Sequence, residues 1–93
     1  MLIYPAYLDQ GENRTLTPEL QLTKETPPIF IFQTADDPYS NSALVMTAAL
    51  RSEKIPVELH ILPSGGHGYG LRQGNFAGIT WPTLAENWLK RIF

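Results

Sequence analysis

A single histidine inside a glycine-rich loop is the most chemically suggestive feature of this sequence. His67 lies in the segment PSGGHGYG, with four glycines around it and no bulky neighbour before Tyr69. Glycines let the backbone turn tightly and keep neighbouring side chains away from the ring. Because an exposed imidazole can move protons near neutral pH, His67 is a candidate general base.

Two adjacent carboxylates, Asp36 and Asp37, stand earlier in the chain in the segment TADDP. A histidine that moves a proton needs a carboxylate on its second nitrogen, which fixes the tautomer and stabilises the imidazolium. Asp36 is the first candidate for this carboxylate, and Asp37 is the substitute. The competing interpretation is an acidic turn beside a solvated glycine loop, and the residue pattern alone leaves both open.

The remaining polar residues suggest no further chemistry. His60 lies among alternating apolar residues and is interpreted as a packed or half-exposed strand residue. Both histidines and the two aspartates have the right types for a metal site, but no HxH or HExxH spacing supports one. No metal or other cofactor is therefore expected. The absence of cysteine excludes disulfides, thiolate ligands and cysteine nucleophiles.

Alternating strands and helices must position the candidate acid and base. Strands are predicted over residues 2–5, 28–35 and 56–63, where apolar runs end at polar residues or proline. Helices are predicted over residues 40–54 and 80–92, where helix formers or tryptophans recur at helical spacing. This order indicates right-handed crossovers and a parallel sheet, and hence an α/β fold.

The two candidate loops follow neighbouring strands of that sheet. TADDP follows the strand over residues 28–35, and PSGGHGYG follows the strand over residues 56–63. Functional groups in parallel sheets gather beyond the carboxyl ends of the strands. The fold therefore predicts that the acidic pair and the histidine lie at the same rim.

The composition is that of one small globular domain. Of 93 residues, 43% are hydrophobic and 17% are charged, which predicts a packed core and not disorder. A net charge of −2 with scattered arginines argues against a nucleic acid partner. No signal peptide and no run of membrane-spanning length is visible, so a soluble chain without a membrane partner, cytoplasmic by default, is expected.

Three segments together resemble part of a known family: TPPIFIFQTADDP, IPVELHILPSGGHGYGLR and the terminal WPTLAENWLKRIF. They are similar to the C-terminal third of α/β-hydrolase esterases, in the acetyl-xylan-esterase-like branch related to dienelactone hydrolases and the prolyl oligopeptidase group. The resemblance implies a partial α/β-hydrolase fold for residues 1–93. It also implies that Asp36 orients His67, which takes a proton from a serine nucleophile.

The sequence departs from that family because it has no nucleophile elbow. None of its four serines lies in a G-x-S-x-G motif, and the segments that form the oxyanion hole in the family precede the region present here. The resemblance therefore implies a fragment of a serine carboxylic-ester hydrolase that is inactive alone. After Asp37 the family usually has the sequence xVP, whereas this chain has PYSNS. The backbone path of the acid loop is therefore not fixed by the resemblance.

Three functional hypotheses follow. The chain is the acid–base piece of an ester hydrolase, or a non-catalytic interaction module that associates through its exposed sheet edge, or a half-domain completed by an N-terminal half on a separate polypeptide. In the first case its partner is an ester substrate in the complete enzyme. Because the strand over residues 2–5 leaves an apolar edge unpaired, we also expect a homodimer, formed through that edge or through a swapped element.

Overall fold

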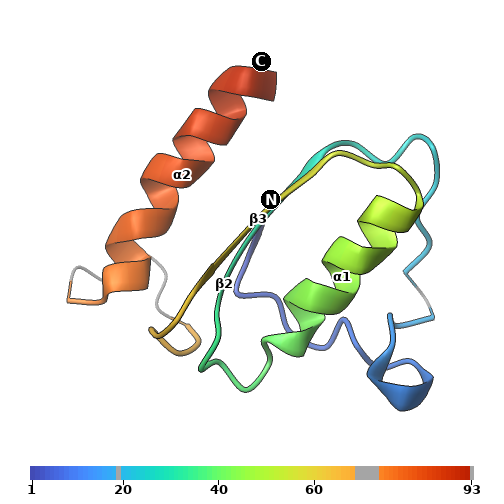
Figure 1. Ribbon diagram of the computed structural model, residues 1–93, viewed down its shortest axis with the longest axis horizontal. Helices are drawn as coiled ribbons and strands as arrows, with labels where there is room; N and C mark the ends of the chain where they lie inside the picture. Colours follow the sequence, from blue (N-terminus) through green and yellow to red (C-terminus); the bar gives the residue numbers. More distant parts are fainter. Residues whose placement is uncertain (19, 69–73, 93) are drawn as a thin grey trace.

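The fold is an alternation of parallel strands and covering helices. The computed structural model describes residues 1–18, 20–68 and 74–92. Its elements in chain order are β1 (Leu2–Ile3), the short 3-10 turn η1 (Glu12–Arg14), β2 (Ile29–Thr34), α1 (Asn41–Ser52), β3 (Val57–Leu62) and α2 (Phe76–Ile92). The strands form one parallel sheet in the order β1-β2-β3, with α1 and α2 on opposite faces (Figure 1). The predicted α/β class and three parallel strands are confirmed.

The bounds of all five predicted elements differ from the prediction, by only one or two residues at each end of β2, α1 and β3. β1 ends at Ile3 and not at residue 5, because Tyr4 takes a φ of 42° and Pro5 follows it. α2 begins at Phe76, before the predicted start at residue 80, because the Asn75 side chain caps its first turn. Pro82 consequently lies inside the helix.

β2 is the centre of the core and is buried on both faces. Phe30 and Phe32 pack against Trp88 and its neighbours on α2, and the Phe30 and Trp88 ring centroids are 5.7 Å apart. Ile31 points to the other face, where the buried residues are Ala43, Met46, Leu50 and Ile55. A continuous apolar run is what a strand covered on both sides requires.

The two helices cover the sheet with one face each. The buried residues of α1 are Ser42, Ala43, Met46 and Leu50, and those of α2 are Ala77, Gly78, Ala85 and Trp88. Their opposite faces are exposed, as expected for amphipathic helices on a sheet. In the described part of the chain, neither helix has the length and apolar character needed to cross a membrane.

The register between β2 and β3 aligns the ends of these strands. Ile29 lies opposite Val57 at the start of the pair, and Thr34 lies opposite Leu62 at its end. The Ala35 N–H donates to the Leu62 carbonyl at 2.8 Å, one residue beyond β2. The loops that follow the two strands therefore begin side by side.

Truncation of Leu50 tests the packing of α1 on the sheet. Leu50→Ala removes a side chain that is 0% exposed, and we expect a loss of about 2–5 kcal/mol in the free energy of unfolding. Leu44→Ala on the exposed face of the same helix is the matched control, with an expected change within about 0.5 kcal/mol. Equal urea unfolding midpoints for the two variants would show that α1 does not dock through this face.

Candidate active site

The loops after β2 and β3 come together at one rim of the sheet. The acid loop, residues 35–40, follows β2, and the described part of the histidine loop, residues 63–68, follows β3. Three hydrogen bonds join the Asp36 and Asp37 side chains to Gly65, Gly66 and His67. The predicted meeting of the acidic pair and the histidine loop is confirmed.

Asp37 is the carboxylate that contacts His67. Asp37 Oδ2 lies 2.7 Å from His67 Nδ1; the Asp37 side chain is 0% exposed and the His67 ring is 32% exposed. The other Asp37 oxygen accepts a hydrogen bond from the Tyr39 N–H at 2.8 Å. Because Nδ1 faces a carboxylate oxygen, we assign the proton of the neutral ring to Nδ1. Nε2 is then the nitrogen left to accept a proton.

Asp36 holds the backbone of the histidine loop, which corrects the predicted pairing of Asp36 with His67. Its Oδ1 accepts a hydrogen bond from the Gly66 N–H at 2.8 Å, and its Oδ2 accepts one from the Gly65 N–H at 3.3 Å. The turn after β2, closed by the Asp37 N–H on the Thr34 carbonyl at 3.3 Å, directs the two carboxylates to different groups. The hydrogen bond from Gly66 is the main cause that lowers the pKa of Asp36 below its ordinary value of 3.8.

The glycines of the loop are required by both backbone conformation and packing. Gly65, Gly66 and Gly68 have φ angles of 141°, 71° and 76°, which side chains disfavour. A Cβ on Gly65 would also lie 2.9 Å from Thr34 Cγ2 and from Ala77 Cβ. The loop therefore approaches the sheet and α2 closely at Gly65.

Two tyrosines flank the imidazole with ring contacts. The Tyr4 centroid lies 4.6 Å from that of His67 at an interplanar angle of 67°, and the Tyr39 centroid lies 5.0 Å away at 65°. Such edge-type contacts are favourable and restrict rotation of the ring. Neither tyrosine was predicted from the sequence, although Tyr4 follows β1 and Tyr39 follows β2, at the rim where functional residues were expected.

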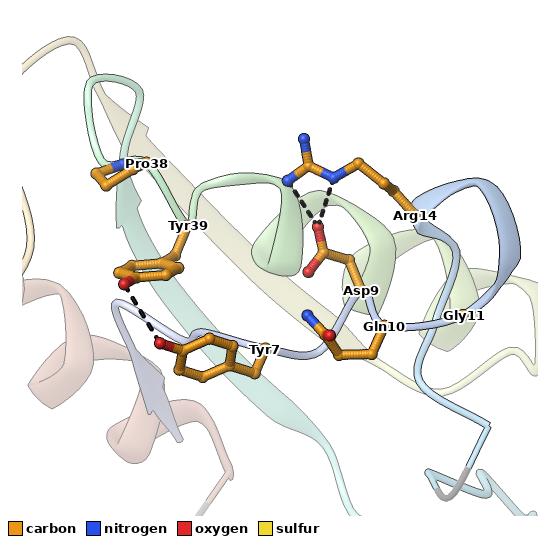
Figure 2. Close-up of a pocket in the computed structure, with 7 residues that line it drawn as sticks. All are labelled: Tyr7, Asp9, Gln10, Gly11, Arg14, Pro38 and Tyr39. Carbon is orange, nitrogen blue, oxygen red and sulfur yellow. Dashed lines mark hydrogen bonds and ion pairs between the residues drawn. The ribbon is translucent and has the colours of Figure 1, made fainter.

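A polar pocket of about 400 Å³ shares Tyr39 with the histidine site. Its lining residues, shown in Figure 2, are Tyr7, Asp9, Gln10, Gly11, Arg14, Pro38 and Tyr39. The Tyr7 and Tyr39 hydroxyls share a hydrogen bond at 3.3 Å, which is the main cause that raises the pKa of Tyr39. Because most of the lining comes from the loop before β2, no strand or helix pattern in the sequence revealed this pocket.

Asp9 anchors that loop to the start of α1. It is a buried carboxylate whose Oδ2 accepts hydrogen bonds from Asn41 Nδ2 at 2.8 Å and from Arg14 Nη2 at 3.0 Å. The Asn41 bond is the main cause that lowers the pKa of Asp9. Ser42 Oγ accepts a further hydrogen bond from the Leu8 N–H at 3.1 Å. The pocket wall is therefore fixed to the fold by partly buried polar contacts.

The other candidate residues lie outside this site. His60 is on β3, where Nε2 lies 2.7 Å from Glu58 Oε2 and the ring packs against Phe30, so its interpretation as a half-exposed strand residue is confirmed. Across residues 1–18, 20–68 and 74–92, no three side chains of metal-ligating type converge. All four serines fall within these ranges, and none of their hydroxyls hydrogen-bonds His67.

This arrangement is part of an α/β-hydrolase fold, as comparison with known proteins shows. MGS-M1, an alpha/beta hydrolase enzyme from a Medee basin deep-sea metagenome library, matches 98% of this chain with a TM-score of 0.74 and 30% identity. An acetyl ester-xyloside bifunctional hydrolase from Caldicellulosiruptor lactoaceticus matches 72% of it with a TM-score of 0.64 and 40% identity. The resemblance that the motifs indicated is confirmed.

A curated relative and the coverage of these proteins complete the comparison. The chain is 41% identical over 61 residues, 62% of its length, to endo-1,4-beta-xylanase B from Butyrivibrio fibrisolvens. No family profile matches the chain. It spans 43% of the MGS-M1 chain, 25% of the Caldicellulosiruptor protein and 9% of the xylanase. These proteins are thus all much longer than the sequence described here.

The lowered pKa of Asp36 predicts part of the acid sensitivity of the chain. Because the pKa of the folded state lies below 3.8, the Asp36 hydrogen bonds stabilise the fold above that pH and are lost as the pH falls through the lowered pKa. Asp36→Asn should therefore flatten the fall in unfolding free energy between about pH 5 and about pH 2. Chemical denaturation across this range measures it, with Glu25→Gln as an exposed-carboxylate control. An unchanged slope in Asp36→Asn would contradict the contact.

Proposed function

We propose that this chain supplies the acid and the general base of a serine carboxylic-ester hydrolase, with Asp37 as the acid and His67 as the base. The observation that carries the proposal is the 2.7 Å contact between the buried Asp37 carboxylate and His67 Nδ1. It supplies the tautomer and the counter-charge that a proton-transferring histidine needs. The similarity to named hydrolases supports the reaction class.

In this proposal His67 Nε2 takes the proton from a serine hydroxyl as its oxygen bonds to the ester carbonyl carbon. The imidazolium then gives that proton to the departing alcohol, and the acyl group stays on the serine. A water molecule releases the acyl group by the same two proton transfers. Asp37 remains ionised throughout and stabilises the imidazolium.

The nucleophile and the oxyanion hole come from another segment, in the same or a separate polypeptide. None of the serines of this chain hydrogen-bonds His67, and none lies in a G-x-S-x-G motif. Without a serine and an oxyanion hole, the acid and base have no acyl acceptor to activate. We therefore expect no ester hydrolysis by this chain alone.

The ester substrate is proposed to place its alcohol portion towards the pocket beside Tyr39. The Tyr39 ring contacts both the His67 imidazole and the Tyr7 ring, so the pocket borders the histidine site. Hydroxyl, amide, carboxylate and guanidinium groups line it, which suits a hydroxylated alcohol better than an alkyl chain (Figure 2). The name of the Caldicellulosiruptor protein, an acetyl ester-xyloside hydrolase, is consistent with a sugar ester.

A chimera tests the catalytic proposal. This chain replaces the aligned segment of the Caldicellulosiruptor hydrolase, and turnover of p-nitrophenyl acetate is measured. We expect activity in the chimera, and His67→Gln or Asp37→Asn should lower kcat about 10³-fold to 10⁴-fold because the triad loses its base or its tautomer. His60→Gln removes the other histidine and should leave kcat unchanged.

Two results would contradict the proposal. Activity of the chimera that does not depend on His67 would remove the general base from the reaction. Turnover by the isolated chain that is abolished by His67→Gln would show that no second segment is needed.

Association through the sheet edge is the second candidate function. β1 pairs with β2 on one side, and the described residues contain no strand on its other side. Tyr4 donates its N–H to Phe32 at 2.8 Å, so by alternation the Ile3 N–H is directed away from β2, towards the open edge. An edge of this kind can pair with another chain.

Light scattering tests this association at millimolar to micromolar chain concentrations. We expect a dimer at the upper end, and a shift towards monomer in Ile3→Pro, which removes the outward N–H group. Leu44→Ala leaves the edge intact and is the matched control, and circular dichroism checks that each variant folds. A strictly monomeric wild-type chain at every concentration would exclude pairing through β1.

A further inference from the structure

We propose that Asn75 is a positioning residue that ties the first turn of α2 to the loop of His67. The inference rests on the proposed role of His67 as general base. Asn75 precedes α2, and its side chain bonds in two directions: Oδ1 accepts the Gly78 N–H at 3.1 Å, and Nδ2 donates to the Gly65 carbonyl at 2.8 Å. The first contact caps the helix, and the second reaches the histidine loop.

The contact with Gly65 completes a set of side-chain hydrogen bonds around the two glycines before His67. Asp36 accepts both of their N–H groups, at 3.3 Å and 2.8 Å. Thr34 Oγ1 donates to the Gly66 carbonyl at 2.7 Å, and Asn75 binds the remaining carbonyl. Since glycine has no side chain to pack, these contacts set the direction in which the chain enters His67.

Asn75 differs from the other two residues of this set in the element that carries it. Thr34 and Asp36 belong to the end of β2 and its turn, and therefore to the same segment as Asp37. Among the described residues, Asn75 provides the side-chain hydrogen bond between the glycines and the start of α2, and α2 is fixed to the sheet by Ala77, Ala85 and Trp88. The packing agrees, because a Cβ on Gly65 would lie 2.9 Å from Ala77 Cβ.

The two functions of Asn75 can be separated by substitution. Asp at this position keeps an oxygen for the Gly78 N–H but has no N–H₂ group for Gly65. Ser also caps helices and is neutral, but its side chain is too short to span to Gly65. Both variants therefore retain the cap and lose the contact with the histidine loop.

The first experiment measures the tautomer of His67 in the full chain. Ring ¹⁵N chemical shifts are recorded for the wild type, Asn75→Asp and Asn75→Ser at a pH where the imidazole is neutral. We expect the Nδ1–H form to dominate in the wild type and the Nε2–H form to increase in both variants. Asn87→Asp, on the exposed side of α2, is the control and should match the wild type.

The second experiment measures kinetics in the chimera described above. A displaced general base lowers kcat, and we expect a fall of about 10-fold to 100-fold for both Asn75 variants with little change in KM. Wild-type tautomer and kcat in both variants would overturn the positioning role and leave Asn75 as a helix cap. If the tautomer changes in the Asn75 variants but His67→Gln leaves the activity of the chimera unchanged, the positioning role is supported and the proposed function is rejected.

Discussion

Burial of β2 between two helices is the constraint on which the rest of the structure depends. Phe30 and Phe32 face α2, and Ile31 faces α1, so a single strand supplies the apolar surface that holds both helices. Its pairing with β3 extends from Ile29 to Thr34 without interruption. A shift in this register would separate the acid loop from the histidine loop and also reverse the faces on which the phenylalanines lie. The geometry of the site is therefore fixed by the same contacts that form the core.

Two adjacent aspartates take different roles because the turn after β2 gives them different surroundings. Asp37 is buried, and a buried carboxylate without partners costs several kcal/mol. The Tyr39 N–H and His67 Nδ1 satisfy its two oxygens. Asp36 is exposed and binds backbone N–H groups, which gives it a structural function at little desolvation cost. The acid that faces the histidine is thus the one that the fold can keep away from water.

Much of this arrangement could be predicted from the sequence, because the signals are periodic or positional. The apolar run of β2, the helix over Asn41–Ser52 and the order of elements place Asp36, Asp37 and His67 at one rim. The choice between the two aspartates could not be predicted. Neighbouring side chains in a turn point in different directions, and the direction depends on whether the turn closes at Thr34. The contact with β3 continues to the Ala35 N–H, which donates to the Leu62 carbonyl, so the position of the turn depends on tertiary pairing as well as on local sequence.

The start of α2 shows a second limit of prediction from sequence. Pro82 is favoured in the first turn of a helix, so the pattern indicated a start near residue 80. In the structure Asn75 provides an earlier cap, and Pro82 lies inside the helix. The Asn75 cap is also stabilised by its hydrogen bond to Gly65 in the histidine loop, and no local sequence pattern indicates that contact.

The histidine site is organised by the residues of this chain without the help of a nucleophile. His67 has a carboxylate on Nδ1 and tyrosine rings at 4.6 Å and 5.0 Å, and side chains hold the glycine pair before it. Because these contacts are already formed, the imidazole would not have to be reordered when a serine docks. The conformational entropy of orienting the His67 ring is lost during folding and not during docking. A solvated loop that had lost its function would need neither a buried carboxylate nor a set of hydrogen bonds around two glycines. The organisation of the site therefore supports the proposed acid–base pair over the interpretation of an acidic turn beside a solvated glycine loop.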